Sequence, residues 1–101
     1  MRAGSLAYGD PGSNDCPANA SRITNATQCQ AAAYAAGRQW YGSTESLPTA
    51  PRGCYWFAYD GAVHLNTDAA GGGNAASQLL CALAPTGACV CVLSACVRVH
   101  V

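Results

Sequence analysis

The stretch Cys54-Tyr55-Trp56-Phe57-Ala58-Tyr59-Asp60-Gly61-Ala62-Val63-His64-Leu65-Asn66 decides the fold of this 101-residue chain. Asp60-Gly61 is typical of a two-residue type I′ turn, and the apolar and aromatic residues around it are typical of strands, so the sequence predicts a β-hairpin. This turn would place Tyr59 opposite Ala62 and Tyr55 opposite Asn66. Side chains alternate between the faces of a strand, and the expected core face carries Cys54, Trp56, Ala58, Val63 and Leu65. The other face carries Tyr55, Phe57, Tyr59, Ala62, His64 and Asn66.

A helix is expected before the hairpin, because Asn25 is a good N-cap and Gln28 stands at the third helical position after it. The Ala-rich segment from Gln28 to Ala36 continues this helix, and Gly37 fits a left-handed C-terminal cap. One helical face then carries Cys29, Ala32, Ala33 and Ala36. These small side chains predict a helix that lies close against the sheet, with a cysteine in the contact.

The other segments are assigned from their turn-forming and apolar residues. Residues 1–22 predict loops, in which only Ser5-Leu6-Ala7-Tyr8 could form a short strand. Residues 41–53, with two prolines and two glycines, predict an exposed loop. Residues 75–84 predict a short second helix that contains Cys81. We expect one small α+β domain, with a loop-rich N-terminal segment (1–22), a cysteine-rich helix–hairpin core (23–81) and an apolar C-terminal strand that extends the antiparallel sheet (82–101).

Composition limits the classes of function. Arginine and lysine together equal aspartate and glutamate at five each, so the chain has no basic field that would attract nucleic acid. The apolar run 82–97 is shorter than the ~18–20 residues of a membrane span. Seven cysteines in so short a chain indicate disulfides and an oxidising compartment. The sequons at Asn19 and Asn25 agree with a glycoprotein that is secreted or held at the cell surface.

Two disulfides are predicted from the expected packing. Cys29 and Cys54 both point into the contact between helix and sheet, and Cys16 with Cys81 is the next pairing we expect. Cys89 and Cys91, two apart on one strand, are not expected to pair with each other. The remaining cysteines are Cys89, Cys91 and Cys96, so one thiol stays free or links to another chain. With His100 these three make a Cys3His set, but its spacing is unusual for zinc, so no metal and no cofactor is expected.

A set of motifs spans roughly residues 23–81: Ile23, Cys29-Gln30-Ala31-Ala32, Pro51-Arg52-Gly53-Cys54-Tyr55-Trp56, Val63-His64-Leu65-Asn66 and Leu80-Cys81. This set resembles a cysteine-rich domain that recurs in predicted secreted proteins of unicellular algae and has no assigned activity. The order of a cysteine-bearing helix before a Cys-aromatic hairpin is also distantly similar to PAN/apple modules, which bind proteins and sugars. The resemblance implies a secreted domain and leaves the three cysteines after Cys81 outside the motif.

The aromatic face of the hairpin is the candidate recognition surface. Tyr55, Phe57 and Tyr59 present flat apolar area beside the polar His64 and Asn66, which suits sugar rings and protein interfaces. The alternative is that the 41–53 loop or the C-terminal strand covers this face, since a two-stranded hairpin alone is only marginally stable.

Enzymatic activity is not expected, because no hydrolase, metalloprotease or phosphate-loop motif occurs. The leading hypothesis is a non-enzymatic extracellular structural module that assembles with copies of itself or other extracellular proteins, as in a filament. Its weakly charged C-terminal strand would offer an unprotected edge to another chain, and its odd cysteine would permit a covalent link. The alternative is a monomeric module that binds carbohydrate or protein through the aromatic face.

Overall fold

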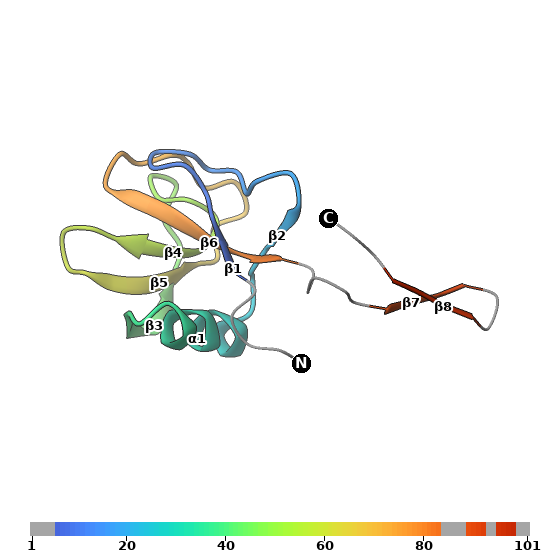
Figure 1. The fold of residues 1–101 in the computed structure, drawn as a ribbon. Helices are drawn as coiled ribbons and strands as arrows, with labels where there is room; N and C mark the ends of the chain where they lie inside the picture. Colours follow the sequence, from blue (N-terminus) through green and yellow to red (C-terminus); the bar gives the residue numbers. More distant parts are fainter. Residues whose placement is uncertain (1–5, 84–88, 93–94, 99–101) are drawn as a thin grey trace.

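The computed structural model of the chain describes residues 6–83, 89–92 and 95–98 (Figure 1). One helix, α1 (Ala26–Ala35), packs on a mixed sheet, which confirms the α+β class. The strands are β1 (Leu6–Tyr8), β2 (Ala20–Arg22), β3 (Gln39–Glu45), β4 (Gly53–Phe57), β5 (Ala62–Asn66), β6 (Ser77–Leu83), β7 (Cys89–Val92) and β8 (Ala95–Arg98). No helix among the described residues is long and apolar enough to cross a membrane.

Six strands form the main sheet, in the order β1-β6-β4-β5-β3, with β2 also paired to β6. All of these pairings are antiparallel except that between β3 and β5, which is parallel. The parallel pairing brings the C-terminal end of β3 beside the C-terminal end of β5, with Glu45 opposite Asn66. Segments that are distant in the sequence therefore meet at this end of the sheet.

Both predicted caps of the helix are present. The Asn25 side chain accepts a hydrogen bond from the Gln28 N–H at 3.0 Å, as expected for an N-cap. At the other end Gly37 has φ +70°, and the N–H groups of Gly37 and Arg38 donate to the carbonyls of Tyr34 and Ala33. This is the Schellman arrangement that a left-handed residue permits. The helix begins at Ala26, directly after the predicted N-cap.

The hairpin forms, but its predicted register is wrong by two residues. Phe57 lies opposite Ala62 and Tyr55 opposite His64, so the connecting loop has four residues instead of two. Gly61, at φ +71°, donates its N–H to the carbonyl of Phe57. A shift of two residues leaves every strand side chain on its predicted face. Ala58 is the exception, because it lies in the longer loop and is exposed instead of facing the core.

Each face of the sheet has its own core and its own disulfide. On the helix side, Cys29 and Cys54 are bridged within a cluster completed by Ile23, Ala32, Ala33, Val63, Leu65 and Leu80. On the opposite side, Cys16 is bridged to Cys81 beside Ala50, Tyr55 and Leu79. Both predicted pairings are confirmed. Closing loops of this length stabilises a small domain by ~3–4 kcal/mol each on the chain-entropy model.

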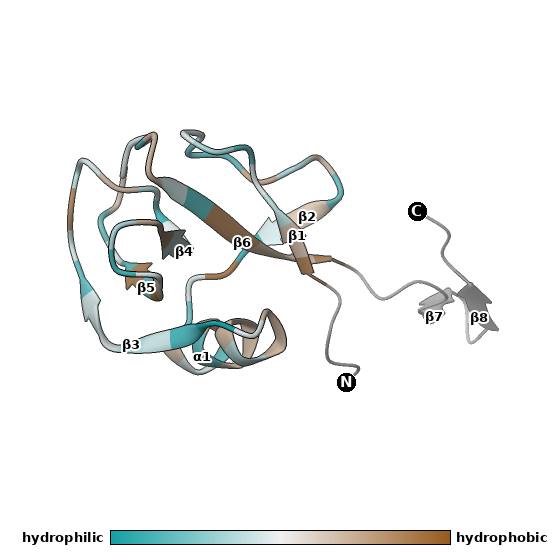
Figure 2. Ribbon diagram, turned by 60° about the vertical axis from the view of Figure 1, so that its left-hand side comes forward, coloured by the Kyte–Doolittle hydropathy of each residue, from teal (hydrophilic) through white to brown (hydrophobic). Residues whose placement is uncertain are grey.

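Three predicted elements differ from the structure. The segment 1–22 is not wholly loop, because β1 forms where a short strand could be expected and β2 forms where none was, and both pair with β6. The segment 75–84 does not form a helix but contains strand β6, in which Leu80 faces the helix side and Leu79 the opposite side. Burial on both faces outweighs the local preference of the alanines for a helix. The segment 41–53 is not wholly loop, since β3 runs to Glu45 and pairs with β5. Figure 2 shows the hydrophobic stretch along β6 and the mainly hydrophilic β3 at the sheet edge.

The C-terminal segment does not extend the main sheet as one long strand. Strands β7 and β8 pair with each other in a separate two-stranded antiparallel sheet, with Cys89 opposite Arg98 and Cys91 opposite Cys96 (Figure 1). His100, which the sequence pattern groups with Cys89, Cys91 and Cys96, lies outside the described residues.

Candidate functional site

A pocket of about 230 Å³ opens on the face of the sheet opposite α1. Its floor is the hairpin face that the sequence singled out, and its walls come from the segment after β3 and the start of β6. The lining residues are Glu45, Leu47, Thr49, Ala50, Tyr55, Phe57, Asp60, His64, Asn74 and Ser77. Polar groups and aromatic rings thus converge in one concave site, which is the usual character of a ligand pocket.

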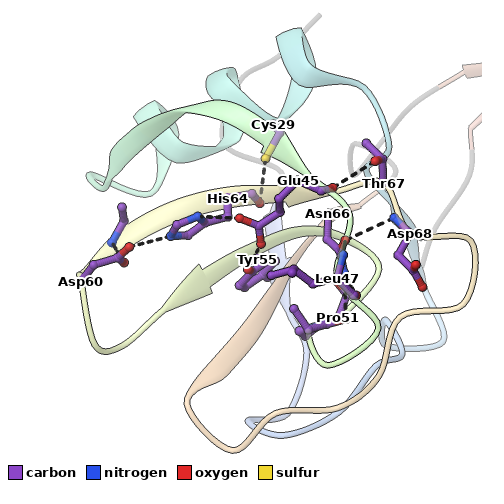
Figure 3. A network of polar contacts seen from close by, with 12 residues as sticks. Cys29, Glu45, Leu47, Pro51, Tyr55, Asp60, His64, Asn66, Thr67 and Asp68 are labelled. Carbon is purple, nitrogen blue, oxygen red and sulfur yellow. Dashed lines mark hydrogen bonds and ion pairs between the residues drawn. The ribbon is translucent and has the colours of Figure 1, made fainter.

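His64 lies between two carboxylates (Figure 3). Its Nε2 is 2.8 Å from Oδ2 of Asp60, within hydrogen-bond distance. Its Nδ1 is 3.3 Å from Oε1 of Glu45 but has no hydrogen-bond partner. Asp60 is fixed in turn, because its Oδ1 accepts the N–H of Ala62 at 2.9 Å. The four-residue hairpin loop therefore positions Asp60 to reach back to the imidazole.

The second oxygen of Glu45 accepts a hydrogen bond from the Tyr55 hydroxyl (Figure 3). Burial of Tyr55, followed by this hydrogen bond and the negative charge of Glu45, raises the pKa of the phenol well above its usual value. Tyr55 consequently stays a neutral donor. Asp60, His64, Glu45 and Tyr55 form a continuous chain of polar contacts across three neighbouring strands and the hairpin loop.

Aromatic rings surround the imidazole of His64. The ring of Tyr41 stacks on it with centroids 4.3 Å apart, and that of Tyr55 stacks at 5.3 Å. Phe57 meets the imidazole edge-on at 6.0 Å, and Tyr59 meets Phe57 edge-on at 5.2 Å. Tyr59 itself is 85% exposed. These rings make the site a partly exposed aromatic patch with a charged interior.

Asn66 has a structural position instead of a ligand-facing one. It is only 1% exposed, and its Nδ2 donates to the carbonyls of Leu47, Ala50 and Pro51. Its Oδ1 accepts the N–H of Leu47 at 2.8 Å and that of Asp68 at 3.2 Å. One buried amide thus holds the loop that forms a wall of the pocket. At Asn66 this face is covered by the 41–53 segment, as in the alternative to a free recognition surface.

Two buried polar atoms at the pocket lack hydrogen-bond partners. They are Oγ of Ser77 and Nδ1 of His64, in side chains that are almost fully enclosed. A buried polar group without a partner costs free energy. A ligand that supplies the missing contact would therefore be stabilised at this site.

Of the five predicted ligand residues, Tyr55, Phe57 and His64 line the pocket and Tyr59 lies beside it. Asn66, at the end of β5, is buried and holds the loop at Ala50. Sequence reasoning missed Glu45, Asp60 and Ser77. Asp60 stands four residues before His64. Had a four-residue hairpin loop been expected, Asp60 could have been predicted to lie within reach of His64. Glu45 carried no local signal, because it reaches His64 only through the parallel pairing of β3 with β5.

The described residues contain no group of three or more His, Cys, Asp or Glu side chains that could hold a metal ion. Comparison with protein-family models, with curated proteins and with solved structures finds no match to this chain.

Proposed function

We propose that this protein is a non-enzymatic extracellular binding module whose ligand enters the pocket between Glu45, Asp60 and Ser77. The observation that carries this proposal is the convergence, inside aromatic walls, of a histidine held between two carboxylates and a buried hydroxyl without a partner. Such a site is rigid before the ligand arrives, because its side chains are tied to neighbouring strands. Preorganisation of this kind favours binding.

The contacts of His64 favour binding over catalysis. A nucleophilic mechanism needs a hydroxyl or thiol that hydrogen-bonds to a base. In the part of the chain that the structure describes, both imidazole nitrogens face carboxylates and the Tyr55 hydroxyl donates to Glu45. The chain of polar contacts is therefore suited to hold the charged group of a ligand.

The covalent chemistry supports an extracellular location. Two disulfides cross-link the domain, one in each core, and structural disulfides persist in oxidising compartments. The sequon residues Asn19 and Asn25 are both exposed. Asn25 caps α1 through its Oδ1, which leaves its Nδ2 for an N-glycan.

The test is a two-dimensional amide NMR screen of the ¹⁵N-labelled full chain against neutral glycosides, amines, carboxylates and short peptides. Binding predicts saturable shifts that cluster at Phe57, Asp60, His64 and Ser77. Phe57→Ala should weaken the response, whereas Tyr34→Ala, which removes an 88% exposed ring on the helix, should leave it unchanged. Shifts scattered over the surface, or none at saturating concentrations, would count against a binding module.

Self-assembly through the C-terminal segment is a second candidate, favoured by one observation. Strands β7 and β8 pair only with each other among the described residues, and an isolated two-stranded sheet is marginally stable in water. Addition of strands from another copy would extend it. Sedimentation velocity should then detect species heavier than 10.3 kDa that dissociate in Val90→Lys. A concentration-independent monomer would contradict this second function.

A further inference from the structure

The two carboxylates of the pocket have little compensating charge. Within residues 6–83 the ion pairs of Glu45 and Asp60 are made with His64 alone. No arginine in this part of the chain lines the pocket. Arg22 pairs with Asp15, and Arg52 makes no ion pair among the described residues. Arg38 lies over the ring of Trp56 at 4.2 Å. The pocket therefore carries an excess of negative charge that an added cation would balance.

The pocket also contains buried polar atoms without a hydrogen-bond partner. Nδ1 of His64 lies 3.3 Å from Oε1 of Glu45 but forms no hydrogen bond. The Ser77 hydroxyl is buried and likewise has no partner. Because the oxygens of both carboxylates accept hydrogen bonds, a ligand with several N–H donors would find acceptors here.

We propose that this pocket binds a protonated primary amine, an inference that rests on the binding function and names its ligand class. An alkylammonium group has three N–H donors and a positive charge, which match the oxygens of Glu45, Asp60 and Ser77. Its carbon chain would contact Phe57 and Leu47, and aromatic faces attract ammonium cations. A volume of about 230 Å³ leaves room for a short alkyl chain.

Other ligand chemistries fit less well. A metal ion needs several ligands that converge on one point, and the described residues contain no such group. A neutral sugar would use the rings but leave the charge of both carboxylates uncompensated. A primary amine occurs in amino sugars, in lysine side chains and in free alkylamines, and these sources share the chemistry that the pocket recognises.

The experiment titrates the labelled full chain at pH 7 with n-butylammonium chloride and, in parallel, with 1-butanol as the neutral isostere. Saturable shifts at Asp60, His64 and Ser77 are expected with the amine only. Asp60→Asn should weaken the affinity at least ~tenfold, because a charged hydrogen bond is lost. Its amide oxygen can still accept from Ala62, which preserves the loop. The matched control Asp10→Asn removes an exposed carboxylate outside the pocket and should bind as tightly as the wild type.

Further titrations distinguish the sources of the amine. Their outcomes also separate the amine proposal from the binding function on which it rests. Methyl glucosaminide and Nα-acetyl-lysine amide show whether a sugar or a peptide carries the amine better. Equal shifts with 1-butanol, or unchanged affinity in Asp60→Asn, would overturn the cation assignment. If neutral glycosides occupy the pocket and amines do not, the cation assignment is wrong while the binding function stands. If no compound reaches the pocket, both fail.

A second inference comes from the register of the C-terminal hairpin. Cys91 of β7 lies directly opposite Cys96 of β8. Residues opposite each other in an antiparallel pair have Cα atoms ~4.5–5.5 Å apart, within the range of disulfides. We infer that Cys91 and Cys96 form a third disulfide. Cys89 lies opposite Arg98, so the register places no cysteine opposite it.

This bridge would form by thiol–disulfide exchange with an oxidised disulfide carrier such as glutathione disulfide. The two cysteine thiols lose two electrons and two protons as the new S–S bond forms, and the carrier disulfide is reduced to two thiols. No other reactant is needed.

The test is peptide mapping of unreduced, iodoacetamide-treated full-length protein. Cleavage after Leu93 separates Cys91 from Cys96, so the two peptides should stay joined until reduced, with the alkyl group on Cys89. Cys89→Ser should keep the link and Cys91→Ser should abolish it. Alkylation of both Cys91 and Cys96, or a link from Cys89 to Cys96, would overturn this inference.

Discussion

The two faces of the central sheet are built from alternate residues of the same strands, yet they are held together differently. The helix face is closed by alanines of α1 and aliphatic side chains, with the Cys29–Cys54 bridge buried among them. The pocket face combines the Cys16–Cys81 bridge with buried polar residues, including His64 and Asn66. The comparison separates two tasks: apolar packing stabilises one face, while polar contacts shape a site on the other.

The largest expected effect distinguishes the two bridges. The Cys16–Cys81 bridge spans 65 residues and the Cys29–Cys54 bridge spans 25. The chain-entropy model predicts that replacing the first pair by alanine costs about 4 kcal/mol and replacing the second about 3.5 kcal/mol. Urea unfolding of the two double variants measures both values. A much larger loss for Cys29→Ala/Cys54→Ala would mean that core packing, and not loop closure, dominates their contribution.

Asn66→Ala should have the next largest effect, a loss of about 3 kcal/mol in the free energy of unfolding. The substitution removes an NH₂ group whose two hydrogens are shared among three carbonyls, and an oxygen that accepts two N–H groups. Each hydrogen bond lost costs ~0.5–1.5 kcal/mol, although the Ala50 carbonyl keeps the N–H of Gly72. Hydrogen exchange should show faster exchange of the Leu47 amide in particular.

The matched variant Asn66→Asp keeps an acceptor for Leu47 but loses the donated bonds to the loop carbonyls. It should therefore be destabilised while it protects the Leu47 amide better than Asn66→Ala does. Equal exchange of that amide in the wild type and Asn66→Ala would show that the loop is held by other contacts.

Local patterns predicted the parts of the fold that depend on neighbours in sequence. The caps at Asn25 and Gly37 and the alternating faces of the hairpin follow from residues within one turn or one strand. The Cys29–Cys54 bridge followed from those faces, whereas Cys16–Cys81 was expected only because the two cysteines flank the core on either side. Strand β6 could not be predicted in this way, because the alanines in and around it favour a helix locally and only pairing with β4 and β1 reverses that preference. The site had the same limit, since Glu45 meets His64 through a parallel pairing.

Tyr55→Phe should have a smaller effect, about 1.5 kcal/mol, because one hydrogen bond to a carboxylate is lost. The pKa of Tyr55 is raised in the folded protein, so its contribution is fully present below the unfolded value of about 10 and is lost as the pH rises above it. Urea unfolding between neutral and alkaline pH should show a steeper decline for the wild type than for Tyr55→Phe. Parallel declines would mean that the hydroxyl does not hold its proton through Glu45.

The smallest expected effect concerns the edge of the pocket face, where Asp68 organises the loop after β5. The N–H of Gly71, followed by that of Ala70, donates to its carboxylate and lowers the pKa of this exposed group. A lowered folded pKa means that the stabilisation is present above the unfolded value of about 4 and disappears as the pH falls through the folded value. Asp68→Asn should therefore be slightly less stable than the wild type at pH 7, and the two should converge in acid. Thermal unfolding measured from neutral to acidic pH, with Asp10→Asn as the control, tests this, and a constant difference across that range would contradict it. If Asp68→Asn lowers the stability little and Asn66→Ala lowers it much, the pocket wall is stabilised mainly by the buried amide of Asn66 and not by the surface charge of Asp68.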